Sequence, residues 1–453
     1  MTRRPRLLLA LAGLGLLSAS SISAAQVGPD VIVGDLPNMQ YFGASGGIAA
    51  YSIATTSCNV GTAQLNWIQS TNQHPVIAQN LYRIKDGRLE QIGMSWLKHG
   101  FCALQQTICG PCQPAGGGCA SRLGVGCSDP YSSGLNGEQS NLGPRSQVNP
   151  WTGQFPFPFS APSAPATIGR RLQVPTGDVT PAQNPGAIYL MEGQYVARAD
   201  ADAGNQNNNA SYRRVNINGP SSFSYPAATV RHKPAIMGRG DLDPTVTVVA
   251  ATVPGEGRLH VAGKTIDNGD GTWTYNYAVH NLNSHIGVSA LSIPLNCGAV
   301  ASDMYFRAPI SHSGEPYSNA PWSMEVRSGD AIVWETESFE ANSNANAIRW
   351  ATTYTFAFTS TSAPSTGRVT LGLFRSGEAL EVAGLPVPGA ACRADWDADS
   401  NVNSGDISSY LTAWLDSVND GTTAADYDCD GAVNSGDISA FLTSWLAALT
   451  GGC

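Results

Sequence analysis

The C-terminal sixty residues contain one short unit written twice, and no other part of the chain constrains its fold as tightly. The first copy covers residues 395–415 and the second covers 426–446, and 14 of the 21 aligned positions are identical. Each copy opens with a 12-residue loop, 395–406 or 426–437, that has Asp at positions 1, 3 and 5. An apolar repeat follows each loop. The sequence therefore predicts two successive units of loop and helix.

The segments after the loops have the apolar spacing of amphipathic helices. Side chains at i, i+3, i+4, i+7 and i+8 are apolar in both copies: Ile407, Tyr410, Leu411, Trp414 and Leu415, then Ile438, Phe441, Leu442, Trp445 and Leu446. Neither helix can bury such a stripe alone, so we expect the two units to pack face to face. No comparable helix precedes either loop, and the units are therefore half EF-hands.

The spacing within each loop suits a calcium ion. Ca²⁺ takes about six to eight oxygen ligands, and a 12-residue loop supplies them from positions 1, 3, 5, 7, 9 and 12. The expected ligands are Asp395, Asp397, Asp399, Asn401, Asn403 and Asp406, then Asp426, Asp428, Asp430, Ala432, Asn434 and Asp437. Position 6 favours Gly because the chain turns there with positive φ. Gly431 fits and Ser400 does not, so we expect two calcium ions, the first bound more weakly. The alternative is a pair of Asp-rich surface loops without metal.

With these loops and helices in view, residues 392–453 resemble type I dockerins, and the frame Cys392 … Gly451-Gly452-Cys453 is similar to the GC-type subset. The resemblance implies a cohesin-like scaffold or surface protein as partner, with Ser404 and Ser435 at the contact. It also implies a disulfide that closes the module's two ends, Cys392–Cys453. Position 11 departs from the family pattern, since it is Gly405 or Gly436, and the helices lack the usual Lys-Arg pair.

Residues 1–25 have the pattern of a secretory signal peptide. Three arginines in the first six residues precede an apolar run, 7–17, that is too short to span a bilayer. Small residues at 23–25 offer a cleavage site, which makes Gln26 the expected mature start. The general secretory route is favoured over the twin-arginine route, because Arg6 stands where the latter wants a hydrophobic residue. We therefore expect a secreted or cell-surface protein without a membrane span.

Ten cysteines in an exported chain indicate disulfides. Five of them fall between residues 102 and 127, in a Gly- and Pro-rich stretch that we expect to be a disulfide-stapled, loop-rich region. Cys109-Gly110-Pro111-Cys112 matches a thioredoxin redox motif, but the following residues cannot continue a helix. A zinc site formed by His99 and these thiols is the other alternative.

The formal charge belongs almost wholly to the C-terminal unit. The chain has 25 basic and 34 acidic residues, a net charge of −9. Residues 392–453 contain ten Asp and one Arg, which is also −9. The signal peptide carries three Arg, so the body, 26–391, has a net charge of −3. Nothing in the body is basic enough to predict binding to nucleic acid.

The body is predicted to be mainly β and too long for a single core. We expect a Cys-rich, loop-containing β domain of unknown function at 26–240 and an antiparallel β-sandwich at 241–388. A short linker, 389–391, precedes the dockerin module, and the Gly- and Pro-rich residues 384–390 look linker-like throughout. In the sandwich the expected strands cover 245–250, 259–266, 273–279, 331–335, 353–358 and 368–374, and 267–271 is a hairpin turn.

The first domain is less regular. Residues 47–53 and 76–100 are expected to form strands, with a turn at Lys85-Asp86-Gly87. Residues 113–165 and 200–225 are rich in Gly, Pro, Asn and Ser, so we expect long loops there. Within the second of these stretches, Asn205 to Asn209 is a polar run that predicts an exposed loop.

No catalytic motif is evident in the body. His74, His99, His280 and His285 are candidates for acid–base or metal chemistry, although a structural role is favoured for each. The aromatics Trp151, Phe155, Phe157 and Phe159 could stack on sugar rings, but the interleaved Pro156 and Pro158 favour packing down a loop. Four glutamates, Glu138, Glu192, Glu315 and Glu340, are available, but spacing alone does not pair them.

Two functions remain from the sequence. In the first, the protein is a dockerin-bearing component of a polysaccharide-degrading or glycan-binding system, and the leading enzymatic activity would be hydrolysis of O-glycosyl bonds. In the second, it is a non-catalytic β-rich surface or matrix protein that its dockerin tethers. Dockerins usually accompany polysaccharide-degrading enzymes, which favours the first function. The absence of a catalytic motif favours the second.

Overall fold

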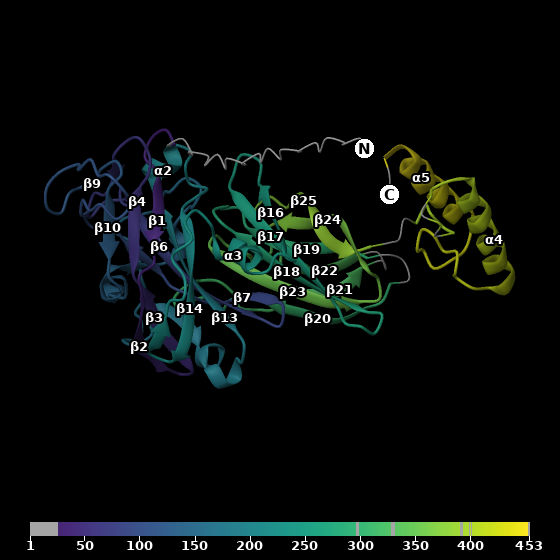
Figure 1. Cartoon of the computed structure of the whole chain (residues 1–453), viewed down its shortest axis with the longest axis horizontal. Helices are drawn as coiled ribbons and strands as arrows, with labels where there is room; N and C mark the ends of the chain where they lie inside the picture. Colours follow the sequence, from purple (N-terminus) through teal and green to yellow (C-terminus); the bar gives the residue numbers. More distant parts are fainter. Residues whose placement is uncertain are drawn as a thin grey trace, which may run out of the picture.

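A computed structural model describes residues 26–295, 299–327, 331–389, 393–397, 399 and 401–451. The chain is mainly β, as predicted, with several antiparallel sheets and a small helical part near its C-terminus. In Figure 1 the strand-rich parts run from purple to green and lie against each other, and the two long helices are yellow. No helix within these described ranges has both the length and the hydropathy needed to cross a membrane.

The largest sheet has ten strands and organises the first half of the body. Its main path runs β15 (Ser222–Ser224), β14 (Ala210–Gly219), β13 (Ile188–Val196), β6 (Val76–Lys85), β7 (Arg88–Met94), β12 (Leu172–Pro175), β3 (Ile48–Ile53) and β2 (Met39–Ser45). β8 (Leu97–His99) pairs with β6 and with β11 (Leu142–Gly143). The predicted turn at 85–87 is confirmed. Asp86 and Gly87 have φ of 51° and 73°, the two-residue hairpin geometry that matches the strand twist.

A second, three-stranded sheet supports the cysteine-rich loop. It contains β1 (Val31–Asp35), β4 (Thr55–Asn59) and β10 (Ser128–Tyr131). Three disulfides staple this region, namely Cys58–Cys109, Cys102–Cys119 and Cys112–Cys127. The two cysteines of the thioredoxin-like motif therefore belong to different bridges, and the thiols that a zinc site with His99 would need are oxidised. The predicted stapled, loop-rich region is present.

Short elements complete this half of the body. They are β5 (Leu65–Asn66), β9 (Arg122–Leu123), α1 (Ser133–Asn136), α2 (Arg198–Asp202), α3 (Ala235–Leu242) and the 3-10 turns Gln139–Asn141, Arg145–Gln147, Thr176–Val179 and Pro181–Gln183.

Two five-stranded antiparallel sheets face each other in the second half of the body. One contains β16 (Thr247–Thr252), β17 (Arg258–Asp267), β18 (Trp273–Asn281), β23 (Thr352–Ser360) and β20 (Ala301–Arg307). The other contains β21 (Ser323–Arg327), β22 (Ala331–Glu335), β19 (Val288–Pro294), β24 (Pro364–Leu373) and β25 (Ala379–Pro388). Aromatic side chains from both sheets fill the core, as where Trp334 lies 6.0 Å from Phe358 between ring centroids.

The expected turn at 267–271 lies between β17 and β18 and is held by its own aspartates. Asp267 accepts the backbone N–H of Gly269 at 2.8 Å, and Asp270 accepts that of Thr272 at 3.0 Å. These carboxylates stabilise the turn, as their sequence position predicts.

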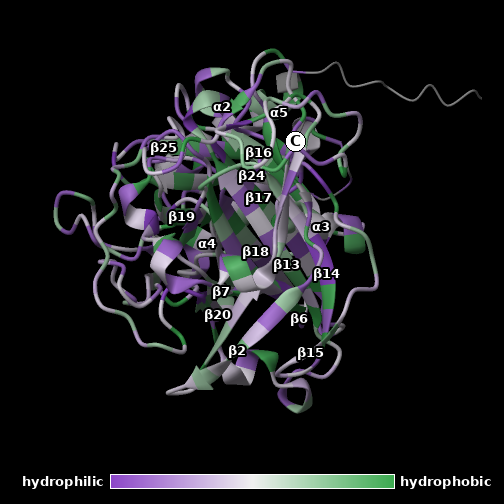
Figure 2. Cartoon of the chain, turned by 90° about the vertical axis from the view of Figure 1, so that its left-hand side faces the viewer, coloured by the Kyte–Doolittle hydropathy of each residue, from purple (hydrophilic) through white to green (hydrophobic). Residues whose placement is uncertain are grey.

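Three predictions for loops were wrong. Residues 384–388, expected as linker, belong to β25, and most of 210–224, expected as loop, forms β14 and β15. Strand β14 buries Tyr212 in one core cluster and Val215 and Ile217 in another. Figure 2 shows hydrophilic and hydrophobic residues along its ribbon. The polar run Asn205 to Asn209 is not an exposed loop, because Asn205, Gln206 and Asn209 are buried.

A buried polar network joins the large sheet to the sandwich. The guanidinium of Arg145 donates to the carbonyl oxygens of Ser95 and Gln79, at 2.6 and 2.9 Å, and to that of Ala351 at 3.3 Å. Ala351 precedes β23 of the sandwich, and its carbonyl also accepts from Asn80 on β6, at 3.2 Å. Apolar contacts surround this network, so the two halves share one continuous interior.

The C-terminal unit contains the two predicted helices, α4 (Ser404–Asp420) and α5 (Ser435–Gly451). The rings of Tyr410 and Phe441 stack at 4.2 Å between the helices. The indole N–H of Trp414 donates to the carbonyl of Asn434, and that of Trp445 to the carbonyl of Asn403, both at 2.8 Å. Each helix is thus hydrogen-bonded to the loop of the other repeat.

The expected Cys392–Cys453 bridge lies outside the described residues, while Cys429 is disulfide-bonded.

We predict that Arg145→Met lowers the free energy of unfolding by about 3 kcal/mol, because it removes the buried hydrogen bonds from the guanidinium to the carbonyl oxygens of Ser95, Gln79 and Ala351. Urea denaturation followed by fluorescence measures the change. Arg327→Met is the matched control. Its guanidinium pairs with the exposed carboxylates of Glu325 and Glu335, so this substitution should leave the midpoint unchanged. Equal midpoints for both variants would show that the network does not join the two halves.

Candidate functional site

Two clusters of three aspartates lie at the start of the C-terminal repeats. Carboxylate oxygens of Asp395, Asp397 and Asp399 lie within 4.8 Å of one another, and those of Asp426, Asp428 and Asp430 do the same. Backbone N–H groups of the loops hold these side chains. In the second loop, for example, Gly431 donates to Asp426 at 2.9 Å and Ala432 donates to Asp430 at 2.8 Å.

The aspartate clusters fit the geometry of one calcium ion each. Two oxygens that both lie within about 2.6 Å of an ion are at most about 5 Å apart, and each cluster meets this condition. Partial desolvation, and then the negative charges of Asp399, Asp406 and Asp395, raises the pKa of Asp397. The pKa of Asp428 is raised in the same way. A divalent cation would relieve this repulsion, and these carboxylates would hold it.

The aspartates at loop position 12 tie each loop to its helix. Asp406 accepts the backbone N–H of Asn403 at 2.8 Å and that of Asp397 at 3.3 Å. Asp437 accepts the N–H of Tyr427 at 2.6 Å and that of Asn434 at 2.8 Å. Burial alone would raise the pKa of Asp406, but these backbone donors hold its pKa below the usual value.

The remaining predicted ligands also have structural partners. Asn403 and Asn434, at position 9, accept the N–H groups of Gly405 and Gly436 at 2.7 Å and so begin α4 and α5. Their side-chain amides donate to the position-7 carbonyl oxygens of Asn401 and Ala432. An asparagine that caps a helix in this way reaches an ion through water, which is common at position 9.

The predicted partner residues stand on an exposed apolar face. Ser404 begins α4, and Leu411 and Leu415 lie seven and eleven residues further along the same side of that helix. Leu415 is 54% exposed, and its counterpart Leu446 on α5 is 59% exposed. We refer to the two sets, Ser404, Leu411, Leu415 and Val418 on α4 and Ser435, Leu442, Leu446 and Leu449 on α5, as the leucine faces.

Leu411, Leu415, Leu442 and Leu446 were expected in the buried stripe of each helix, and they are exposed instead. The helices pack through the aromatic positions Tyr410 and Phe441, and this turns the leucines outward. Their role as surface residues was therefore missed. The signal was present in the sequence, because leucines recur at the same positions of both copies.

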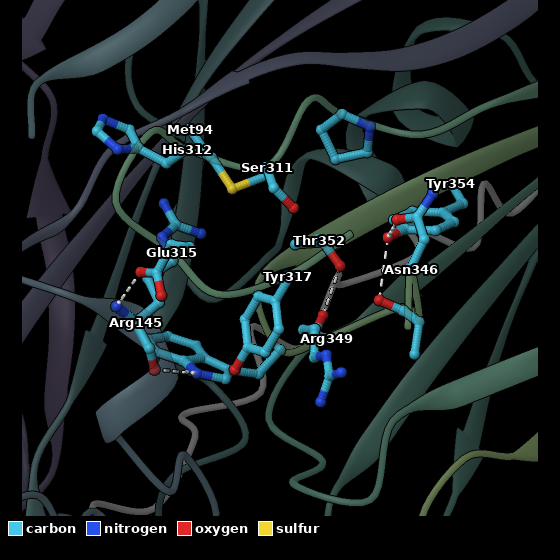
Figure 3. Close-up of a pocket in the computed structure, with 13 residues that line it drawn as sticks. Met94, Arg145, Ser311, His312, Glu315, Tyr317, Asn346, Arg349, Thr352 and Tyr354 are labelled. Carbon is cyan, nitrogen blue, oxygen red and sulfur yellow. Dashed lines mark hydrogen bonds between the residues drawn. The ribbon is translucent and has the colours of Figure 1, made fainter. Parts of the chain in front are cut away.

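A narrow cavity lies beside the Arg145 network and has a volume of about 30 Å³. Figure 3 shows Arg145, Glu315, Tyr317 and Arg349 around it. The carboxylate of Glu315 accepts the backbone N–H of Arg145 at 2.5 Å and that of Ser146 at 3.2 Å. The cavity has room for one or two waters and none for a sugar ring, and Glu315 has a structural task.

Arg198 lines two larger hollows. Their volumes are about 280 and 380 Å³. Neutral hydrogen-bonding side chains dominate the lining of both: Asn66, Gln73, Asn72, Ser146, Gln147, Asn149 and Gln154. One carboxylate, that of Asp202, is among the lining residues, and it pairs with Arg198 at 3.6 Å. These hollows suit a polar neutral ligand and lack the paired carboxylates of a glycosidase.

The other candidate catalytic glutamates do not come together. Glu192 is fully buried and accepts hydrogen bonds from Asn80 and Tyr82, at 2.7 and 3.1 Å. Glu138 and Glu340 are exposed and line none of the three hollows.

Three of the candidate histidines, His74, His99 and His280, are buried, whereas His285 lines the hollow of about 380 Å³. A backbone carbonyl only accepts, so Nδ1 of His74 donates to Ile68, 3.2 Å away, and its Nε2 accepts from Nδ1 of His99 at 2.8 Å. The rings of Phe155 and Phe157 pack on both imidazoles, which confirms the prediction that these aromatics pack down a loop. His280 is buried beside Thr353, at 2.9 Å.

No family model matches the chain, and no curated protein matches it. Among solved structures, the serine-rich repeat adhesion glycoprotein Srr1 from Streptococcus agalactiae covers 75% of this chain and 89% of its own, at 8% identity and a TM-score of 0.20. The N-terminal domain of the Streptococcus gordonii adhesin Sgo0707 covers 80% and 96%, at 8% identity and a TM-score of 0.19. Scores this low do not establish a common fold, and we infer nothing about function from these adhesins.

The histidine pair predicts acid sensitivity. Burial lowers the pKa of His74 to about 4 and that of His99 to about 3. Both are neutral in the folded state, whereas the unfolded chain takes up protons below about pH 6.5. Relative to a His74→Leu/His99→Leu variant, the native protein should therefore lose stability as pH falls from 6.5 towards 4. Urea denaturation at several pH values measures this difference, and a constant difference would contradict the assignment.

Proposed function

We propose that this protein is an exported, non-catalytic β-rich protein whose calcium-loaded C-terminal unit attaches it to a cohesin-like scaffold or surface protein. The observation that carries the proposal is the doubled aspartate cluster, in which three carboxylates converge at the start of each helix. Two ions in these loops would fix the loops against α4 and α5, because Asp406 and Asp437 already connect loop and helix.

The leucine faces support attachment to a protein partner. Apolar side chains gathered on an exposed surface mark interaction sites in soluble proteins. The surrounding unit has ten Asp and a single Arg, so a partner surface that is apolar at its centre and basic at its rim would match it. The α4 face carries Asp416 and Asp420 nearby, whereas the corresponding positions on α5 are Ala447 and Gly451. The α5 face therefore suits the more apolar contact.

The compartment and the body fit the same proposal. Three disulfides stabilise the loop-rich region, as is usual for exported proteins. The narrow cavity and the two hollows beside Arg198 bring no two carboxylates together, and this favours a tethered binding or structural protein over a hydrolase.

A second candidate function is glycan binding by the hollows beside Arg198. Asn and Gln amides both donate and accept hydrogen bonds, as sugar hydroxyls do, and they dominate this surface.

Release of reducing sugar from any member of a polysaccharide panel would overturn the non-catalytic assignment.

We predict that the two calcium sites respond in opposite directions to changes at loop position 6. Gly431 has a φ of 86°, so Gly431→Ala strains the second loop and should weaken its site about tenfold. Ser400→Gly should strengthen the first site. Isothermal titration of the full-length protein measures both, and the absence of calcium binding in the native protein would refute the central proposal.

We also predict calcium-dependent binding to at least one member of a panel of type I cohesins, measured by biolayer interferometry. Leu446→Asp should weaken this binding by tenfold or more, because it places a charge in the α5 face. Val300→Asp changes an equally exposed apolar residue of the body and should have no effect. Binding that survives both calcium removal and Leu446→Asp would contradict the proposed surface.

A further inference from the structure

The polar run Asn205 to Asn209 packs against the first described residues of the chain. The side-chain amide of Asn205 donates to the carbonyl oxygens of Val27 and Pro29, at 3.0 and 2.8 Å. Asn209 is only 1% exposed. Five consecutive polar residues are therefore partly withdrawn from water, and something in their surroundings must compensate their lost hydration.

Two buried carboxylates lie among these amides. Asp30 is 1% exposed and Asp200, on α2, is 0% exposed. Asn208 donates to one oxygen of Asp30 at 3.1 Å, and Asn209 donates to one oxygen of Asp200 at 2.8 Å. The other oxygen of Asp200 accepts the backbone N–H of Val31 at 2.9 Å, so Asp200 lies against the peptide that follows Asp30.

No positive side chain compensates this pair. Among the described residues, no Lys, Arg or His nitrogen lies within 4.0 Å of either carboxylate. Burial raises the pKa of both carboxyl groups, and charging both without a counter-charge would be strongly unfavourable. The surroundings supply amide groups, whose dipoles neutralise only part of that charge.

Three oxygen atoms in the same cluster have no hydrogen-bond donor and no contact with solvent. They are Oδ1 of Asp30, Oδ1 of Asn208 and Oδ1 of Asn209. The hydrogen bonds of these side chains use Oδ2 of Asp30 and the Nδ2 groups of Asn208 and Asn209. The three Oδ1 atoms are therefore left as acceptors without a donor. Buried acceptors without donors are rare, and one recognised cause is an ion that the acceptors hold.

We propose that Asp30, Asp200, Asn208 and Asn209 form a third cation site, in the body of the protein and separate from the C-terminal loops. The ligand atoms are carboxylate and amide oxygens, and neither thiol nor imidazole is included. Hard oxygen donors of this kind select calcium over zinc or copper.

Such an ion would join the N-terminal end of the described chain to a stretch of sequence about 170 residues further on. The segments joined are the residues leading into β1, the short helix α2 and the 205–209 run. The first of these follows the expected signal-peptide cleavage site, so the ion would fasten the mature N-terminal segment to the sheet. This role is independent of attachment to a scaffold, and it is not implied by the dockerin resemblance.

The test counts calcium ions bound to the full-length protein by native mass spectrometry. The native protein should bind three. Asp397→Ala/Asp428→Ala, which disables both C-terminal loops, should bind one. Asp30→Asn/Asp200→Asn keeps the side-chain shapes and should bind two. Asp129→Asn is the matched control, since Asp129 is equally buried and accepts the N–H of Leu104 at 2.9 Å, and it should still bind three.

The outcomes separate this proposal from the proposed function. No ion bound to the Asp397→Ala/Asp428→Ala variant would overturn the body site and leave the dockerin sites standing. One ion bound to both the native protein and that variant would support the body site and refute the C-terminal ones.

A second measurement covers the case in which Asp30→Asn/Asp200→Asn fails to fold. The thermal midpoint of the Asp397→Ala/Asp428→Ala variant should rise by several degrees in millimolar calcium and not in equal magnesium. An unchanged midpoint in calcium would contradict the proposal.

Discussion

Carboxylates repel one another at short range, and this chain brings them together near both ends of its described part. At the C-terminal end, backbone N–H groups hold three aspartates of each loop within 4.8 Å. Near the N-terminal end, Asp30 and Asp200 are buried among asparagine amides. Within the described ranges, no Lys or Arg nitrogen lies within 4.0 Å of the carboxylates of Asp30 or Asp200. Cations in the positions that we propose would relieve the repulsion at both ends.

The body between these clusters is held by a different kind of interaction. Arg145 is buried between the large sheet and the sandwich, where its guanidinium donates to carbonyl groups of both. Glu192 and Glu315, which sequence alone leaves as candidate catalysts, are instead hydrogen-bonded parts of this interior. Glu315 connects the two halves of the body through the backbone N–H groups of Arg145 and Ser146, and Glu192 accepts hydrogen bonds within the first half.

Much of the regular structure followed from periodicity. Strand β22 agrees with its predicted range, 331–335, residue for residue, and the helices of the C-terminal unit follow their apolar spacing. Strand β21 was missed although Met324 and Val326 alternate with polar residues, and all five of its residues are exposed. Strand β25 was mistaken for linker because it contains Gly384, Pro386 and Pro388, and an edge strand tolerates proline that a central strand does not. The polar run at 205–209 looked exposed, because nothing in the local sequence reveals the distant carbonyls and carboxylates that receive its amides.

The most direct test of the account is amide hydrogen exchange of the full-length protein in calcium and in EGTA, read by mass spectrometry. We predict that α4 and α5 lose protection in EGTA, because their loops then hold uncompensated carboxylates, while β17, β18 and β23 of the sandwich keep theirs. Equal protection of α4 and α5 in the two solutions would contradict the claim that calcium holds this unit together.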